Sequence, residues 1–307
     1  MNSATLAIDV MGGDYGFKHN VAAVNTFLKK NKKANLLLVG DKNKINPIVS
    51  CNDRVRVIHT DQYIAMDESP VDALRSKKKS SIKVALDLVK NGDAKAAVSA
   101  GNTGALVALA KFSIGMESGI KRPVLAAEGI DCNGKSRLFL DLGANVDCSA
   151  KMLHQFALLG SKAFMHSYPE IIAPKVRLFN VGSEHVKGSV IIKEAAALLD
   201  FDESINYCGY VEGDGIVGSD ADVIVVDGFT GNIALKSIEG TITCLLGKPS
   251  PLRNLILLLF KNSVKKRIAL MPGPSAVLLG IKKPVYKVHG SAPQAMFVKA
   301  LDKAFRQ

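Results

Sequence analysis

The sequence predicts an α/β protein in which a mostly parallel sheet lies between two layers of helices. Short apolar runs of strand length alternate with longer helical segments along most of the 307 residues. Glycine follows nearly every predicted strand, as at residues 12–13, 101 and 143. Because each crossover helix must pack back onto the sheet, this β-turn-α rhythm favours parallel strands covered on both faces.

Composition indicates a globular chain with excess positive charge. Hydrophobic residues make up 48%, charged residues 22%, and the net charge is +12. This charge predicts an acidic partner, namely nucleic acid, an anionic membrane surface or an acidic protein, with simple solubility as the alternative. The five cysteines form no CxxC pair and the histidines are scattered, so neither a disulfide frame nor a metal site is predicted. Without a signal-peptide pattern or a spanning apolar run, the chain is expected in the cytoplasm.

The first predicted strand, residues 5–10, runs into a turn containing Gly12, Gly13 and Asp14. Ligands bind at the carboxyl ends of strands in open α/β sheets, so this turn is a candidate site. Turn and cap chemistry is the alternative role for Asp14 and for Asp9. Further helices or strands are predicted over residues 20–29, 35–39, 54–59 and 82–90, and Pro70 suits the first turn of a helix capped by Ser69.

The central turn, residues 98–105, combines a strand, glycines and a helix start. This layout aims backbone N–H groups and a helix dipole at an anion. Glycine allows close approach of a ligand, while the polar residues cap the helix and offer donors. The residues concerned are Gly101, Asn102, Thr103 and Gly104. An ordinary glycine-rich βα turn is the alternative interpretation.

Four more strand-then-glycine turns follow farther along the chain. The turns span residues 141–145, 182–188, 213–214 and 227–232, after strands predicted at 137–140, 175–181, 207–212 and 221–226. Near the end, His289 stands beside Gly290 and Ser291 between a strand and a helix, where it can bond a phosphate or thioester oxygen. A structural histidine and a Ser291 helix cap are the alternatives.

Residues 252–271 break this rhythm. Apolar residues recur at helical spacing, five basic residues lie largely off that stripe, and no acidic residue occurs between Thr241 and Met271. Prolines bracket the segment, as expected for a protruding insertion. A basic amphipathic helix suits a membrane surface or partner, and a core-packing or dimer helix is the alternative.

Several of these segments, in order, resemble one family along nearly the whole chain. They are residues 8–14, 68–81, 98–105, 140–145, 182–188, 227–236 and 289–291. The chain resembles the bacterial acyl-carrier-protein:phosphate acyltransferases of phospholipid synthesis. It departs from them at residues 15–17, where proline is usual, and at 282–284, where a small glycine-containing stretch is usual.

The resemblance implies transfer of a long-chain acyl group from acyl carrier protein to inorganic phosphate, giving acyl phosphate for phosphatidic acid synthesis. It implies an isocitrate/isopropylmalate dehydrogenase-like fold, with one domain over residues 1–307 and a helical insertion at 240–274. It further implies a homodimer at the inner face of the cell membrane, no metal or cofactor, and a downstream glycerol-3-phosphate acyltransferase. A phosphotransacetylase-like enzyme using acyl-CoA and a basic nucleic-acid-binding protein are the alternatives; absent nucleic-acid motifs weigh against the latter.

The resemblance also assigns residue roles. Lys187 is expected to neutralise phosphate or oxyanion charge and Asn232 to donate to the oxyanion, with a helix-start lysine and a cap as the alternatives. The expected substrate- and phosphate-binding residues are Gly12, Gly13, Asp14, Ser99, Gly101, Asn102, Thr103, Gly104, Asn145, Glu184, Thr230, Gly231 and His289. The expected membrane contacts are Leu255, Leu259, Phe260, Lys261 and Lys265.

Overall fold

A computed structural model of the chain describes residues 4–50, 53–131, 133–246 and 275–306. The chain divides into two compact units, which we call the first unit (Met1–Pro123 with Pro274–Gln307) and the second unit (Val124–Gly273). Most of the predicted insertion at residues 240–274, including the five expected membrane contacts, lies outside the described residues. The insertion therefore stays a prediction. The single domain over residues 1–307 also stays a prediction.

The first unit is built on a mostly parallel sheet with strand order β3-β2-β1-β4-β11-β10. Every neighbouring pair is parallel except β10 with β11. Its strands are β1 (Ala4–Asp9), β2 (Ala34–Gly40), β3 (Val55–His59), β4 (Ala96–Ser99), β10 (Ser275–Leu279) and β11 (Val285–Val288).

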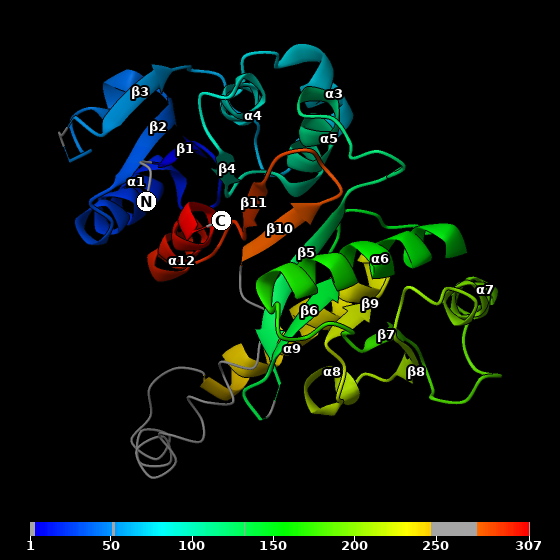
Figure 1. Cartoon of the computed structure of the whole chain (residues 1–307). Helices are drawn as coiled ribbons and strands as arrows, with labels where there is room; N and C mark the ends of the chain where they lie inside the picture. Colours follow the sequence, from blue (N-terminus) through cyan, green and yellow to red (C-terminus); the bar gives the residue numbers. More distant parts are fainter. Residues whose placement is uncertain (1–3, 51–52, 132, 247–274, 307) are drawn as a thin grey trace, which may run out of the picture. The chain divides into compact units, whose positions relative to one another are not determined.

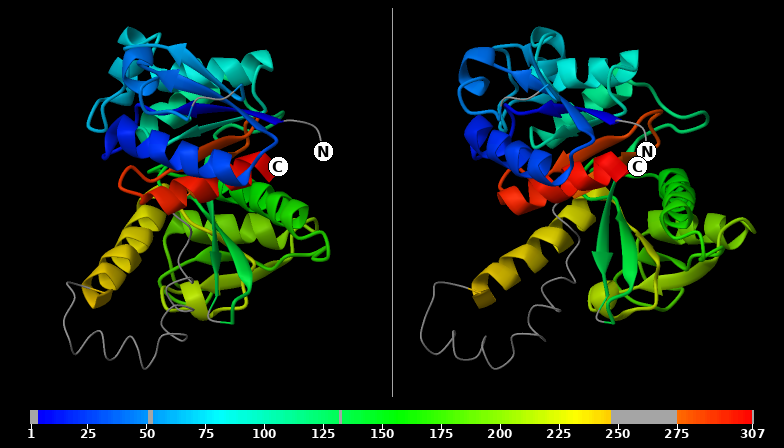
Figure 2. Two further views of the ribbon diagram at one scale, coloured as in Figure 1. Left: turned by 90° about the vertical axis from the view of Figure 1, so that its left-hand side faces the viewer. Right: turned by 60° about the vertical axis from the view of Figure 1, so that its left-hand side comes forward.

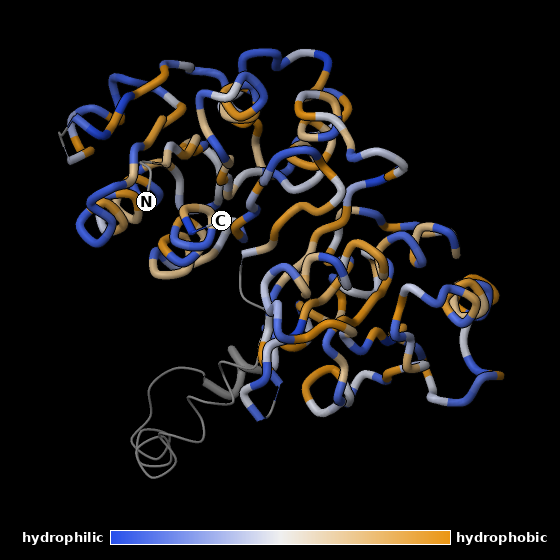
Figure 3. The backbone as a smooth tube through the Cα atoms, in the orientation of Figure 1, coloured by the Kyte–Doolittle hydropathy of each residue, from blue (hydrophilic) through white to orange (hydrophobic). Residues whose placement is uncertain are grey.

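Helices cover both faces of this sheet. Its helices are α1 (Gly16–Lys30), α2 (Lys42–Ile45), α3 (Pro70–Ser76), α4 (Ser81–Asn91), α5 (Thr103–Ser113) and α12 (Gln294–Arg306). The blue α1 and red α12 pack together on one side, whereas α4 and α5 lie on the other (Figures 1 and 2). Covered on both faces, β1 buries Leu6 and Ile8 completely. Strands are mostly hydrophobic, and many connecting loops are hydrophilic (Figure 3).

The second unit repeats this plan with strand order β5-β6-β9-β7-β8. Only β5 with β6 is antiparallel. Its strands are β5 (Val124–Ile130), β6 (Ser136–Leu140), β7 (Val176–Phe179), β8 (Tyr207–Val211) and β9 (Val223–Val225). Its helices are α6 (Ala150–Ser167), α7 (Val190–Asp200), α8 (Gly215–Gly218) and α9 (Gly228–Leu246).

Alternating side chains decide which helix covers which face of the second sheet. A Cβ on Gly160 of α6 would lie 2.7 Å from Val223 and 2.8 Å from Leu140, so α6 packs directly on their face. Their neighbours Phe139 and Ile224 point the other way and cluster with Ile216 of α8 and partly buried residues of α9.

The predicted three-layer α/β arrangement is confirmed within each unit. The antiparallel strands β5 and β10 were not predicted, because neither follows the strand, glycine turn and helix rhythm. Three helices begin earlier than the sequence predicts: α1 at Gly16 where residue 20 was expected, α5 at Thr103 where residue 105 was expected, and α9 at Gly228 where about residue 233 was expected. Among the described residues, no helix is both long and apolar enough to cross a membrane.

Candidate functional site

Three neighbouring parallel strands of the first unit, β1, β4 and β11, carry its predicted site residues at their carboxyl ends. The turns after them contact one another through backbone. Gly290 O accepts the N–H of Asp14 at 3.0 Å, and a Cβ on Gly12 would lie only 2.5 Å from Gly101 Cα. Glycine is therefore required at residue 12 by close backbone packing.

A buried carboxylate anchors these turns. Asp9 Oδ1 accepts the N–H groups of Met11 and Gly12 at 3.1 and 3.3 Å. Its Oδ2 accepts the Ser99 hydroxyl at 2.6 Å, and Ser99 Oγ accepts the Gly101 N–H at 3.0 Å. Asp9 is fully buried, and this burial raises its pKa. Asp9 and Ser99 thus hold the turns in place from inside the fold.

Asn102 caps the start of α5, as predicted, and Gly104 in its first turn packs closely against α3. Asn102 Oδ1 accepts the Ala105 N–H, while its amide donates to backbone carbonyls of residues 65, 66 and 68. A Cβ on Gly104 would lie 2.7 Å from Pro70 Cγ. Close packing against α3 therefore requires glycine at residue 104, and the predicted ligand approach there stays a prediction. The N–H groups of Thr103 and Gly104 have no carbonyl partner within the helix and suit an anion.

His289 lies at the same sheet edge as the central turn, because β11 pairs with β4 as far as Lys287 and Ser99. Its Nδ1 hydrogen-bonds Ser291 Oγ at 2.8 Å. Since α12 begins only at Gln294, Ser291 does not cap that helix. The family departure at residues 282–284 leads straight into β11 and is paired with β4 through the Ala97 N–H bond to Pro284 O.

The other departure from the family also has a local structure. Gly16 adopts a φ of +68°, and α1 begins there. The ring of proline holds φ near −65°, so a proline at residue 16 would need a different turn. Here a glycine-specific conformation opens the helix.

The second unit shows the same arrangement on β6, β9 and β7, again three neighbouring parallel strands. Asp141 follows β6 and is fully buried, which raises its pKa. Its Oδ1 accepts the N–H groups of Gly143 and Ala144, and its Oδ2 accepts the backbone N–H and the side-chain amide of Asn145. Asn145 is consequently a buried part of the turn.

The first turn of α9 packs tightly on this anchored turn. Asn145 O accepts the Gly228 N–H at 2.7 Å, and a Cβ on Gly231 would collide with Asp141 O. Asp227 accepts both the N–H and the hydroxyl of Thr230 at 2.8 Å. Asn232 lies beside Gly143, because a Cβ built on Gly143 would be 3.7 Å from the Cβ of Asn232. Asn232 is half-buried, and the glycine turns at residues 141–145 and 227–232 set its position.

The loop after β7 presents a cation. Asn180 donates to the carbonyls of Gly182 and Lys187, which fixes the loop from within. Glu184 and Lys187 are exposed, and both side chains lie over Gly182, whose Cβ would be 2.7 Å from Glu184 Oε2 and 3.0 Å from Lys187 Cγ. This edge can therefore offer an ammonium group to an anion.

The predicted site residues that the structure describes lie after strands at the carboxyl edge of one sheet in each unit. Turn chemistry, the alternative role predicted for Asp9, is what the structure shows, whereas sequence reasoning did not identify the anchoring roles of Asp141 and Asn180. Asp9 and Asp141 share a sequence signal, because an aspartate closes a buried strand and a glycine follows within three residues. The site roles of the predicted residues stay predictions.

Solved structures share this fold over nearly the whole chain. A phosphotransacetylase from Streptococcus pyogenes aligns with a TM-score of 0.67 at 16% identity, covering 99% of this chain and 95% of that one. An isocitrate dehydrogenase from Methylococcus capsulatus aligns with a TM-score of 0.50 at 8% identity, covering 99% and 85%. The chain therefore has the fold of these two enzyme classes, as predicted.

Sequence similarity assigns the family. The profile of the fatty acid synthesis protein family matches residues 4–307. A phosphate acyltransferase from Pseudomonas syringae pv. syringae is 44% identical over 319 residues, covering 99% of this chain and 93% of that protein. The chain belongs to the fatty acid synthesis protein family.

Proposed function

We propose that this chain is a phosphate acyltransferase, which transfers a fatty acyl group from acyl carrier protein to inorganic phosphate. One observation carries the proposal. A chain matched by the family over residues 4–307 presents Lys187 and Asn232 at one sheet edge of its second unit. Its relatives along the full length are named phosphate acyltransferase.

The proposed reaction needs positioning more than base strength. A phosphate oxygen attacks the thioester carbonyl carbon, the new C–O bond forms, and the C–S bond breaks as the carrier leaves and takes up a proton. Phosphate is already a dianion near neutral pH, so holding it next to the carbonyl supplies much of the rate. Lys187 offsets the phosphate charge, and the Asn232 amide donates to the oxyanion.

We assign the other predicted residues to two tasks. Asp14, Thr103, Gly104, Glu184 and His289 stand at the sheet edges and bind or orient the anionic substrates. The remaining members form and brace the turns, Gly13 through its φ of +96° and the others through the contacts described above; they are Gly12, Gly13, Ser99, Gly101, Asn102, Asn145, Thr230 and Gly231.

The proposal also covers where in the cell the enzyme acts and what it binds there. We infer that it acts in the cytoplasm as a homodimer attached to anionic lipid, and hands acyl phosphate to a glycerol-3-phosphate acyltransferase. The net charge of +12 and the basic amphipathic pattern at residues 252–271 support this, because each basic residue near such a surface contributes about 1 kcal/mol. The expected result is binding to anionic but not neutral vesicles, abolished in Leu255→Asp and Leu259→Asp. Loss of the dimer or fold in those variants would instead assign the stripe to the core.

The test of the activity is direct. The chain is incubated with palmitoyl acyl carrier protein and phosphate, and acyl phosphate and free carrier are measured. Parallel reactions use acetyl-CoA, and a binding assay uses duplex DNA at increasing salt. Product from the carrier thioester is expected. Reaction with acetyl-CoA alone would favour a phosphotransacetylase, and salt-sensitive DNA binding without turnover would favour a nucleic-acid-binding protein.

A further inference from the structure

The outer side of α7 in the second unit exposes a large amount of apolar surface. Eight of the eleven residues of α7 are apolar, and three of these, Ala195, Ala196 and Leu199, are buried on the inner side, which packs on α6. The tube of α7 is largely orange (Figure 3). A helix that is apolar all round is normally buried on all sides, so the outer side of α7 is expected to have a partner.

One apolar face extends from the loop after β7 along the outer side of α7. Phe201, directly after α7, is 89% exposed, and Val190 at its start is 68% exposed. Val190, Leu198 and Phe201 are spaced i, i+8 and i+11, which puts them on one side of the helix. We call this surface the apolar face of α7; its members are Val186, Val190, Ile191, Ala197, Leu198 and Phe201.

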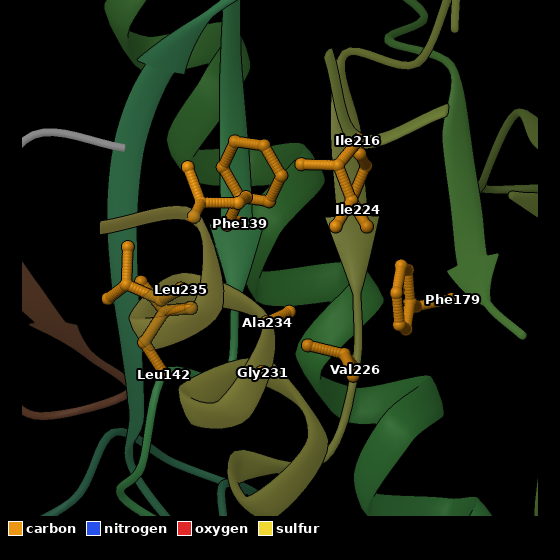
Figure 4. Close-up of a pocket in the computed structure, with 10 residues that line it drawn as sticks. Phe139, Leu142, Phe179, Ile216, Ile224, Val226, Gly231, Ala234 and Leu235 are labelled. Atoms are coloured by element: carbon orange, nitrogen blue, oxygen red, sulfur yellow. The ribbon is translucent and has the colours of Figure 1, made fainter. Parts of the chain in front are cut away.

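The apolar side chains beneath α9 show how the second unit covers such residues elsewhere. Phe139, Ile216 and Ile224 are buried together there (Figure 4). A Cβ on Gly231 would lie 2.8 Å from Val226 Cγ1, so α9 packs directly on the end of β9. The apolar face of α7 receives no such cover from the described residues, because its members stay exposed. A contiguous apolar patch of this kind marks an interaction site.

The charges around the apolar face exclude an anionic partner. Residues 184–203 contain five acidic residues and two basic ones, Lys187 and Lys193. An anionic lipid surface, a nucleic acid or an acidic protein would therefore be repelled. A second copy of the chain matches the face, because it offers an equal apolar surface and complementary charges. Lys193 and Glu194 are adjacent and both exposed, so a two-fold pairing can set the lysine of each copy against the glutamate of the other.

We infer that two copies of this chain pair through the apolar face of α7. This inference rests on the proposed function, which includes a homodimer, and names the surface that holds the dimer together. The surface is linked to the site, because Lys193 Nζ donates to Val186 O at 3.4 Å and Val186 directly precedes Lys187. Covering the face therefore restrains the loop that presents Lys187, so pairing and turnover are coupled.

The oligomeric state of the full chain tests the inference directly. Analytical ultracentrifugation of the wild-type protein should show a dimer at micromolar concentration. Val190→Asp and Phe201→Ser should each raise the dissociation constant of the dimer about a hundredfold or more, because each removes an apolar anchor from both copies. Aspartate suits the first turn of a helix, so Val190→Asp should keep the fold, which circular dichroism checks.

Two matched variants on other exposed surfaces are the controls. Val71→Asp makes the same change in the first turn of α3, and Phe112→Ser removes an exposed phenylalanine from α5. Both should keep the wild-type dimer. A monomeric wild-type protein, or an unchanged dimer in both Val190→Asp and Phe201→Ser, would overturn the inference.

Exchange of the two charges tests the two-fold pairing. Lys193→Glu and Glu194→Lys should each weaken the dimer about fivefold, because like charges then meet across the contact. An equal mixture of the two variants should recover most of the wild-type affinity. A mixture that pairs no better than either variant alone would contradict the inferred contact.

Turnover separates this inference from the proposed function. The turnover of Val190→Asp with palmitoyl carrier protein should rise with protein concentration as dimers form. Acyl phosphate made at the full rate by monomers would overturn the inference alone. A dimer that is lost in the variants of the face, without acyl phosphate from any wild-type reaction, would overturn the proposed activity and leave the contact between copies assigned to α7.

Discussion

The two units use the same anchor at their sheet edges but leave different groups uncovered. Asp9 and Asp141 are both fully buried after a strand, and each accepts N–H groups from the glycine turn that follows. In the first unit the turns close on one another, with Gly12 against Gly101. In the second unit Lys187 stays exposed, and Asn232 is half-buried beside Gly143. A glycine turn therefore marks where a site can form, and the groups it leaves uncovered decide the chemistry.

The largest expected effect falls on the uncovered polar groups of the second unit. Lys187→Ala and Asn232→Ala should each lower turnover with palmitoyl carrier protein by about 10²-fold or more, the scale of losing one transition-state donor. Lys151→Ala, an exposed lysine on α6, is the control and should keep normal turnover. Near-normal rates in both test variants would remove these residues from the mechanism.

A smaller effect is expected where each unit packs backbone against a glycine. A Cβ on Gly12 would lie 2.5 Å from Gly101 Cα, and a Cβ on Gly228 would lie 2.5 Å from Asn145 O. Alanine at either residue should cost about 1–3 kcal/mol in the free energy of unfolding, because backbone must shift. Gly213→Ala, with no atom within 4 Å, is the control. Amide hydrogen exchange should show that protection falls in the first unit for Gly12→Ala and in the second unit for Gly228→Ala. Wild-type stability with a raised phosphate KM in Gly12→Ala would show that this glycine serves the ligand.

The smallest expected effect separates buried from exposed carboxylates by pH. Burial raises the pKa of Asp9 above its ordinary value of 3.8, so the folded state keeps a proton to a higher pH than the unfolded chain does. Its contribution to stability should therefore be complete below about pH 3.8 and fall as pH rises through the folded pKa. Asp220 behaves oppositely, since Lys175 and then Arg177 lower its pKa to about 2. Its stabilisation is present above pH 3.8 and is lost as pH falls toward 2.

Urea unfolding across pH measures this contrast. Asp220→Asn should flatten the loss of stability below about pH 4, with a small amplitude because the Asp220 side chain is 51% exposed. Asp9→Asn should instead flatten the decline above about pH 4. The same pH profile in both variants would contradict the contrast between buried anchor and surface ion pair.

Local features were predictable, and contacts distant in sequence were not. The cap at Asn102 and the helix start at Pro70 follow from residue type and neighbours, and both are confirmed. The need for glycine at residue 104 comes from Pro70, which lies far away along the chain. Phe139, Ile216 and Ile224 come from two strands and a short helix and meet in one core cluster, so no single segment signals it. Antiparallel β5 and β10 are each followed by another strand, so they lack the helix that marked the parallel strands.

The central claim is that inorganic phosphate itself attacks the acyl thioester. The chain is supplied with palmitoyl carrier protein and phosphate labelled with ¹⁸O at all four oxygens, and the acyl phosphate is analysed by mass spectrometry. Attack by phosphate on the carbonyl keeps the bridging oxygen, so the product should carry all four labelled oxygens. A product that has lost one label, or unlabelled fatty acid in place of acyl phosphate, would contradict the claim.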